Sequence, residues 1–251
     1  MKVATFNVNG IRARGKEVSM WAFQEKPEIL CLQEIKASPE QVEIDTCSLP
    51  GYATHWHGQK GGYSGVSIHV RDELPAPRFY VPAFDMETRV LVAEIGKAHV
   101  ACVYAPNGGK DYEAKLRFYE AMIAWAGEMI AAGNPLIITG DLNIAHRDID
   151  LHKTQRKADA IGQRPEERVL FDRLLATGLV DTGRALHPDN DKMFTWWPYW
   201  KAARPRNVGW RIDYVLASEG LAKEARAAGV RAEVGTSDHA PFVTEFAQPF
   251  A

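Results

Sequence analysis

The chain has 251 residues, of which 46% are hydrophobic and 25% are charged, and this ordinary composition excludes disordered, collagen-like and fibrous classes. Thirty basic residues stand against 32 acidic ones, so the net charge is −2. Taken alone, this charge argues against a general polyanion-binding protein, because such proteins usually carry an excess of Lys and Arg.

Short apolar runs recur along the chain and predict β-strands. Each run has four to six residues, many of them β-branched, and is bounded by turn-forming residues. In chain order the predicted strands are Val3–Phe6, Ile29–Leu32, Val66–Val70, Val90–Ile95, Val100–Tyr104, Leu136–Thr139, Ile212–Leu216 and Pro241–Phe246.

Helical patterns lie between some of these strands. One is expected within Gly15–Glu25, and a shorter one begins at Ser38-Pro39-Glu40. The longest covers about Asp111–Ala132 and ends at Gly133-Asn134-Pro135, and another begins at Pro165 and ends near Gly178. Because the helices are few and irregularly placed, the pattern predicts an α/β or α+β fold of two packed sheets flanked by helices. We expect one domain over residues 1–251.

The cysteines and the apolar runs indicate a cellular setting. Cys31, Cys47 and Cys102 are far apart in the sequence and form no CxxC pair, which favours reduced thiols over a disulfide or zinc scaffold. The first residues are too polar for a signal peptide, and no run approaches the ~18 apolar residues of a membrane span. We therefore expect a cytoplasmic protein that does not associate with membranes.

Polar residues that ligate metals or transfer protons lie at the ends of several predicted strands. They are Asn7 and Asn9, Glu34, Tyr104 and Asn107, Asp141 and Asn143, Asp213 near the start of its strand, and Asp238 and His239 just before the last strand. This set is rich in oxygen and contains no cysteine, which favours Mg²⁺ or Mn²⁺ over zinc. A Mg²⁺ ion held by one or two carboxylates usually acts on a phosphate ester.

Each of these residues also has a simpler structural explanation. Glu34 could be a solvated loop residue, and Tyr104 could belong to the core. Asp141 and Asn143 could form an Asx turn, and the Asp238-His239 pair could lie in a cap or turn. The functional interpretation requires that these side chains converge in space, which sequence spacing alone does not establish.

Six sequence blocks resemble one known family in order and in spacing. They are TFNVNGIR at 5–12, CLQEIK at 31–36, VYAPNG at 103–108, GDLNIAH at 140–146, GWRIDY at 209–214 and SDHAP at 237–241. Together they resemble the exonuclease III family of apurinic/apyrimidinic endonucleases, within the endonuclease/exonuclease/phosphatase superfamily. The resemblance covers residues 2–247 and implies a four-layered sandwich of two mixed sheets flanked by helices.

The resemblance also implies an activity and a partner. The implied enzyme is a Mg²⁺-dependent hydrolase of base excision repair, with Mn²⁺ as a possible substitute. It would cut the phosphodiester 5′ to abasic sites in double-stranded DNA and remove 3′ blocking groups or act as a 3′→5′ exonuclease. A monomer is expected.

For the metal, the resemblance implies that Glu34 is the main ligand. Asp238 and Asn7 would lie near the ion, with Asn9 in support. Asp141, Asn143 and His239 are further candidates for the metal site.

For catalysis, the resemblance implies that Asp141 orients and deprotonates the attacking water, with Asn143 beside it. His239, held by Asp213, would contact the scissile phosphate. Tyr104 and Asn107 would donate hydrogen bonds on the phosphate side. A cation and a protonated histidine together would offset the negative charge of the phosphodiester.

The stretch from Lys192 to Arg211 combines basic and aromatic residues and has no acidic residue. Such a mixture suits backbone phosphates and an extrahelical nucleotide, although at least half of the aromatics could be core residues. The resemblance implies that Trp196 and Trp210 line the pocket for a flipped abasic sugar. Arg211, Asn207 and, outside the stretch, Lys36 are further predicted DNA contacts. We thus expect a local basic rim around an acidic metal pocket.

The sequence departs from the family in the loop His152–Arg164, which reads HKTQRKADAIGQR. Family members commonly carry an Asn-rich segment that ends in Gly-Phe here. The balance between abasic-site cleavage and 3′ exonuclease activity therefore stays open. So does an alternative in which the same fold acts on RNA or on phospholipid head groups. A non-catalytic nucleic-acid-binding module is disfavoured because every candidate metal and base residue is present.

Overall fold

The computed structural model describes residues 1–59 and 61–248, and in this part of the chain twelve strands form two six-stranded sheets. The first sheet has the order β11-β12-β1-β2-β4-β3. Its strands are β1 (Lys2–Asn7), β2 (Ile29–Gln33), β3 (Tyr52–His57), β4 (Val66–Arg71), β11 (Ala225–Val230) and β12 (Phe242–Phe246).

The second sheet has the order β5-β6-β7-β8-β10-β9. Its strands are β5 (Arg78–Tyr80), β6 (Val90–Ile95), β7 (Ala98–Tyr104), β8 (Leu136–Asp141), β9 (Leu179–Asp181) and β10 (Asp213–Ser218). Each sheet is mixed, because β1 pairs with β2 and β7 with β8 in parallel while the other pairings are antiparallel.

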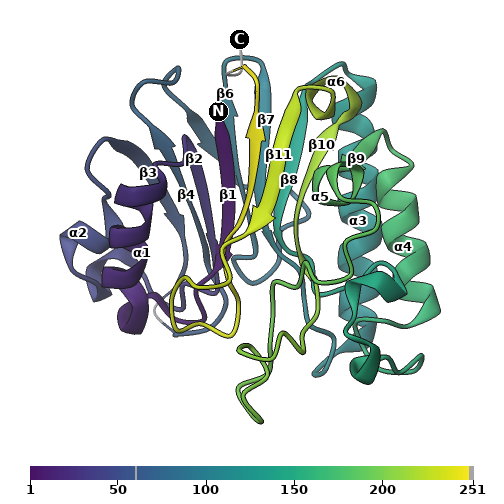
Figure 1. Ribbon diagram of the computed structural model, residues 1–251. Coiled ribbons are helices and arrows are strands. Elements are labelled where there is room, and N and C mark those ends of the chain that lie inside the picture. Colours follow the sequence, from purple (N-terminus) through teal and green to yellow (C-terminus); the bar gives the residue numbers. More distant parts are fainter. Residues whose placement is uncertain (60, 249–251) are drawn as a thin grey trace.

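Helices flank the two sheets (Figure 1). They are α1 (Ile11–Glu25), α2 (Ile44–Cys47), α3 (Tyr112–Ala131), α4 (Pro165–Leu175), α5 (Thr182–Leu186) and α6 (Glu219–Ala222). Three short 3-10 helices span Pro39–Gln41, Asp148–Asp150 and Lys153–Gln155. With α1 and α2 outside one sheet and α3 and α4 outside the other, the predicted four-layered sandwich is confirmed.

The central strands are apolar along their whole length because both of their faces are buried. In β1, Val3 packs between the sheets, whereas Ala4 and Phe6 pack on the side of α1. In β8, Ile137 faces the other sheet, and Leu136 and Ile138 pack with the residues of α3 and α4. Alternating side chains thus serve two cores, as expected where helices or a second sheet cover each face.

All eight predicted strands are present, with ends that differ by at most two residues. Sequence reasoning missed β3, β5, β9 and β11. Two of these are only three residues long, and β3 and β11 are partly exposed, so they lack a continuous apolar run. The first helix begins earlier than predicted, at Ile11, and the predicted helix at Pro39 is a single 3-10 turn.

The structure is consistent with reduced thiols, because Cys31 and Cys102 are free and buried. The side chain of Cys47 lies outside the described part of the chain. Among the described residues, no helix has the length and apolar character needed to cross a bilayer.

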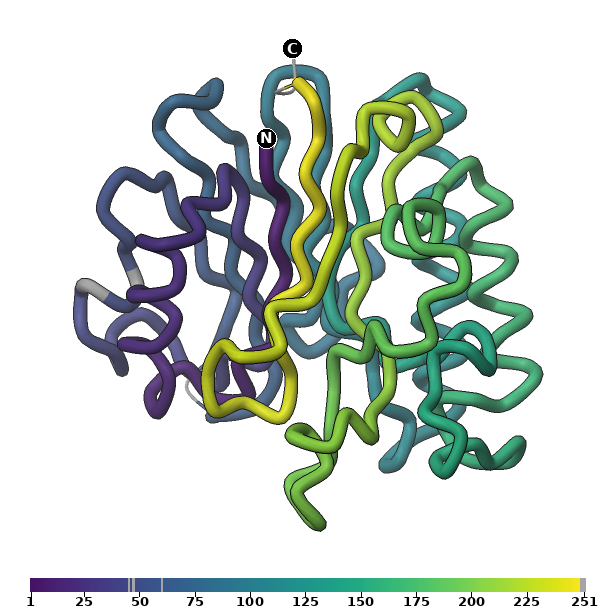
Figure 2. The backbone as a smooth tube through the Cα atoms, viewed as in Figure 1, coloured from purple at the N-terminus to yellow at the C-terminus, as the bar shows by residue number. Residues whose placement is uncertain are grey.

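Pairing brings the polar strand ends together at one edge of both sheets. In the parallel pairs, Asn7 lies opposite Gln33 and Tyr104 opposite Asp141, while the antiparallel pair β8–β10 places Asp213 opposite Asp141. The loops that carry 192–207 and 231–239 lie at this same end of the molecule, and the N-terminus and the end of β12 lie at the other end (Figure 2).

Candidate active site

Asn7 joins the two sheets at the centre of the site. Its Nδ2 donates to Glu34 Oε1 at 2.8 Å and to Asp141 Oδ2 at 2.8 Å. Its Oδ1 accepts from the backbone N–H of Asn9 at 3.0 Å. The amide therefore presents its donor to both carboxylates and holds them side by side, a positioning role that sequence reasoning did not assign. Its prediction as a metal neighbour stays a prediction.

Possible ligand atoms of Glu34, Asp141 and His239 cluster within the described part of the chain, and the two carboxylates are the ones placed to share a cation. One ligand atom from each lies within 4.8 Å of the others. Glu34 also has a left-handed backbone with φ 49°, a conformation that costs a non-glycine residue about 1–3 kcal/mol. Two converging carboxylates provide hard oxygen ligands, so the donor set fits a divalent metal ion of the Mg²⁺ type.

Asp238 lies beside this group and is held by two donors. Its Oδ1 accepts from Asn9 Nδ2 at 2.9 Å, and its Oδ2 accepts from Trp196 Nε1 at 3.0 Å. Burial acts to raise the pKa of Asp238, but the charge of His239 and these hydrogen bonds outweigh burial, so the pKa is lower than usual. Asp238 is thus a carboxylate whose position is fixed next to the candidate metal site.

His239 lies between two buried carboxylates. Its Nδ1 is 2.9 Å from Asp213 Oδ2, and its Nε2 is 3.7 Å from Asp141 Oδ2. Burial acts to lower the pKa of His239, but Asp213 and Asp141 outweigh it and raise the pKa to about 10. The imidazolium form is therefore favoured at neutral pH, and it offsets the repulsion between two carboxylates that face each other on neighbouring strands.

Asp141 is the most perturbed carboxylate of the site. Burial raises its pKa to about 7, with repulsion from Asp213 and Glu34 adding to the effect and the charge of His239 opposing it. A carboxylate with a pKa close to neutral is well matched to accept a proton during catalysis.

Replacing Asp213 by asparagine is expected to lower the pKa of His239, because the main stabilising charge on its Nδ1 side is lost. A folded-state pKa raised above the unfolded value contributes stability at low pH that is lost as the pH rises from about 6.5 to about 10. The metal-free wild type should therefore lose unfolding free energy over this range, and Asp213→Asn should lose less of it. Urea unfolding in chelator at several pH values measures this slope, and equal slopes would contradict the assignment.

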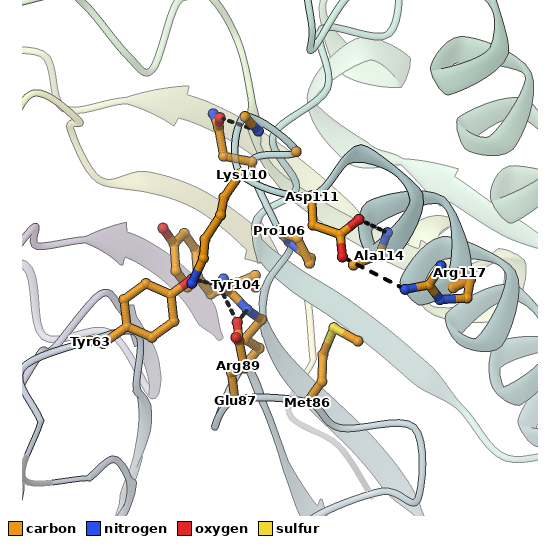
Figure 3. A pocket seen from close by; sticks show the side chains of 13 residues that line it. Tyr63, Met86, Glu87, Arg89, Tyr104, Pro106, Lys110, Asp111, Ala114 and Arg117 are labelled. Atoms are coloured by element: carbon orange, nitrogen blue, oxygen red, sulfur yellow. Dashed lines mark hydrogen bonds and ion pairs between the residues drawn. The ribbon is translucent and has the colours of Figure 1, made fainter.

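Tyr104 is fixed by a buried arginine. The Arg89 guanidinium lies 4.6 Å from the Tyr104 ring centroid and 5.4 Å from that of Tyr63, and its Nη2 donates to Tyr63 Oη at 2.7 Å. Figure 3 shows these three side chains along a cavity of about 580 Å³ that also contacts Lys110. Burial and the nearby charges of Glu34 and Asp141 raise the pKa of Tyr104, so its phenol remains an O–H donor at neutral pH.

Asn107 and Asn143 bond to each other at the ends of β7 and β8. Asn107 Nδ2 donates to Asn143 Oδ1 at 3.2 Å, and Asn143 Nδ2 donates to the carbonyl of Ala105 at 3.0 Å. The backbone N–H of Asn143 donates to Asp141 Oδ1 at 3.0 Å. Asn143 therefore orients Asp141 through its backbone, and its own prediction as a metal ligand stays a prediction.

A second cavity of about 330 Å³ opens directly over the carboxylates. Its polar side holds Glu34, Tyr104, Asn107, Asp141, Asn143, Asp238 and His239, and its apolar side holds Ile161, Gly162, Trp196, Trp210 and Ile212. The indole rings of Trp196 and Trp210 meet edge to face, with centroids 5.5 Å apart. Most of the predicted site residues thus converge here, whereas Ile161, Gly162 and Ile212 were missed. The divergence of the 152–164 loop was the only signal for the first two.

The structure corrects the prediction for Arg211. Its side chain is wholly buried, with Nε 2.7 Å from Asp150 Oδ1 and Nη2 2.7 Å from Asp181 Oδ2. A guanidinium enclosed in this way supports the loop behind the cavity and is not exposed to DNA. The same stretch contributes Arg204, which sequence reasoning counted as basic surface but which donates to backbone carbonyls of 232–239.

Two other predicted DNA contacts are engaged within the protein. Asn207 Oδ1 accepts from Trp197 Nε1 at 3.0 Å, and its Nδ2 donates to the carbonyl of Lys192 at 3.0 Å, so both ends of the amide are used. Lys36 Nζ lies 2.7 Å from Glu34 Oε2 and 2.7 Å from Asn9 Oδ1. Lys36 therefore sits at the candidate metal site itself. Tyr199 and Trp200 are 61% and 65% exposed on the neighbouring loop.

This combination of a four-layered sandwich with a carboxylate–histidine cluster at one edge defines a class of metal-dependent enzymes that act on phosphate esters. The chain belongs to the endonuclease/exonuclease/phosphatase family, whose family model matches residues 4–239. It is 35% identical over 250 residues to an exodeoxyribonuclease of Bacillus subtilis (strain 168). The matched region covers 96% of this chain and 97% of the relative.

Solved structures agree with this assignment. An AP endonuclease from Archaeoglobus fulgidus matches with a TM-score of 0.88 and 30% identity, over 98% of this chain and 99% of the other. The 3′ phosphatase NExo from Neisseria, bound to a product DNA hairpin, matches with a TM-score of 0.89 and 31% identity, over the same shares of the two chains.

Proposed function

We propose that this protein is a metal-dependent DNA repair nuclease of the exonuclease III type. It cuts the phosphodiester 5′ to abasic sites in duplex DNA. It also removes 3′ blocking groups or acts as a 3′→5′ exonuclease. The observation that carries the proposal is the arrangement of Glu34 and Asp141 around Asn7, next to the Asp213–His239 pair and beneath the Trp196–Trp210 wall. The relatives named above, an exodeoxyribonuclease, an AP endonuclease and a 3′ phosphatase, support it.

Mg²⁺ is the proposed cation, with Mn²⁺ as a substitute. Glu34 and Asp141 would hold it, with Asp238 close by. When bound, the cation supplies positive charge that offsets the negative charge gathering on the phosphate in the transition state.

The remaining chemistry is assigned to side chains of this chain. Asp141 accepts a proton from the attacking water, whose oxygen bonds to phosphorus as the bond from phosphorus to the 3′ oxygen breaks. His239, held as an imidazolium by Asp213, donates from Nε2 to a phosphate oxygen. Tyr104 and Asn107 donate from the other side of the cavity. The leaving 3′ oxygen takes a proton from solvent water, so the products are a 3′ hydroxyl and a 5′ phosphate.

The two tryptophans on the apolar side of the cavity favour abasic DNA as the substrate. Trp196 and Trp210 offer aromatic surface for a sugar that has lost its base and has been turned out of the helix. The alternative substrates, RNA and phospholipid head groups, are not favoured, because the named relatives act on DNA or on abasic sites. We also propose that the protein acts as a monomer in the cytoplasm.

A substrate panel tests this choice. The protein is incubated with MgCl₂ and, in turn, a duplex with one abasic analogue, a duplex with a 3′ phosphate, a single-stranded RNA and phosphoinositide vesicles. We expect turnover of the two DNA duplexes. Hydrolysis of the RNA or the lipid, with both duplexes inert, would contradict the proposed substrate and favour the alternative.

DNA binding is expected to depend strongly on salt in spite of the net charge of −2. Each phosphate contacted by a basic side chain should contribute about −0.9 to the slope of log K against log salt. Fluorescence anisotropy of labelled abasic duplex in Ca²⁺ buffer, over a series of KCl concentrations, measures the slope. Binding that does not respond to salt would exclude a local basic rim.

A further inference from the structure

A wholly buried ion pair lies behind the site, outside the residues that line its cavity. Lys115 on α3 and Glu167 on α4 have no exposed side-chain surface, and Lys115 Nζ is 2.6 Å from Glu167 Oε1. Neither residue belongs to the cavity lining. Since charged pairs are rarely buried so completely, and an apolar pair of similar volume is often at least as stable, the pair calls for an explanation other than stability.

Lys115 binds the backbone of two site residues. Its Nζ donates to the carbonyl of Asn143 at 2.8 Å and to that of Asn107 at 3.2 Å. These two asparagines bond to each other through their side chains and lie on the polar side of the cavity. One ammonium group therefore sets the spacing between the ends of β7 and β8.

Glu167 holds the loop that forms the apolar side of the cavity, opposite the two asparagines. Its Oε2 accepts from the backbone N–H of Gly162 at 2.7 Å and from that of Arg164 at 3.0 Å. Gly162 packs so closely that an added Cβ would lie 2.9 Å from the Trp210 ring and 3.3 Å from the Asn143 carbonyl. Gly162 thus cannot shift toward these neighbours without moving Trp210 or Asn143.

We propose that Lys115, through its pair with Glu167, is a positioning residue that sets the distance between the Asn107–Asn143 side and the Gly162–Trp210 side of the cavity. The inference rests on the proposed nuclease function and deepens it. Lys115 does not line the cavity, so it acts on the rate of cleavage through the geometry of these two sides, and its charge also reaches Asp141.

The test separates positioning from folding with a neutral double variant. Lys115→Met alone leaves the Glu167 carboxylate buried without its positively charged partner, so it should lower both the melting temperature and kcat. Lys115→Met with Glu167→Gln removes both charges but keeps an acceptor for the Gly162 and Arg164 N–H groups. We expect this double variant to regain most of the melting temperature while its kcat on abasic duplex stays about 10–10²-fold low and KM changes little.

Ile95→Ala is the matched control, because Ile95 is a core residue at the end of the sheets far from the site. It should lower the melting temperature and leave kcat unchanged below that temperature. The indole N–H signal of Trp210 in a ¹H–¹⁵N spectrum should move in the double variant and stay in place in Ile95→Ala.

Three outcomes would overturn the role of Lys115. They are wild-type kcat in the double variant, a kcat loss in Ile95→Ala equal to that of the double variant, and an unmoved Trp210 signal. Failure of the proposed function is distinguishable, because it would appear as a wild-type protein that does not nick DNA, while the Trp210 signal would still report on positioning.

Discussion

Asp141→Asn is expected to lower kcat for abasic-site cleavage by about 10²–10⁴-fold, the usual contribution of general-base catalysis. The substitution keeps the volume of the side chain and an acceptor for the Asn143 N–H, but it removes the group that takes the proton from water. Single-turnover cleavage of an end-labelled abasic duplex measures the loss. Affinity for the same duplex should change little, because the Trp196–Trp210 wall remains intact.

Asp141→Asn also has a predicted effect on the stability of the folded protein, and its direction follows from the pKa of Asp141. Because the folded-state pKa of Asp141 is raised to about 7, ionisation of Asp141 disfavours the folded protein as the pH rises through that value. Asp141→Asn should therefore leave the metal-free protein at least as stable as the wild type above neutral pH. Full cleavage activity in the variant would remove Asp141 from the mechanism, and a large loss of stability would show that the activity loss reflects misfolding.

Glu34→Gln is expected to raise the metal concentration needed for half-maximal cleavage by more than about 10²-fold, since loss of even an outer-shell partner of a metal site costs about 10–100-fold in affinity or activity. The glutamine keeps an acceptor for Asn7 Nδ2, so the Asn7 link between the sheets can persist. The neighbouring Lys36 ammonium loses its carboxylate partner and further repels a cation.

Titrating Mg²⁺ and Mn²⁺ against cleavage rate, with calorimetric metal binding in the absence of DNA, measures this effect. Glu73→Gln is the matched control, because Glu73 is an exposed residue just beyond the end of β4 remote from the site. Its metal dependence should equal that of the wild type. An identical metal titration for Glu34→Gln would exclude Glu34 as a principal ligand.

The sequence indicated the convergence of the site without establishing it, because the predicted site residues share positions at strand ends. Asn7, Glu34, Tyr104 and Asp141 each lie at or just after the carboxyl end of a strand that is buried on both faces, and such strands give continuous apolar runs. The parallel pairing of β1 with β2 and of β7 with β8 then brings these ends to one edge. The partly exposed edge strands β3 and β11 have no such run and could not be predicted.

The errors concern long polar side chains, whose surroundings depend on residues far away in the sequence. Arg211 was predicted to contact DNA, but its partners Asp150 and Asp181 lie 61 and 30 positions away. Lys115 was missed because a lysine in a helix is usually solvated, and nothing local indicates that Glu167 will meet it in the core. Periodicity predicts which face of a helix is buried, but it does not predict which ionic partner a buried charge finds.

The most direct test of the central claim is cleavage of an end-labelled duplex with one abasic analogue, first in MgCl₂ and then after addition of excess EDTA. We expect a single nick immediately 5′ to the analogue, with a 3′ hydroxyl at the nick. Cleavage should stop completely in EDTA and resume when Mg²⁺ is restored. An intact duplex in MgCl₂, with no trimming of its 3′ ends, or new nicks that continue to form in excess EDTA would contradict this claim.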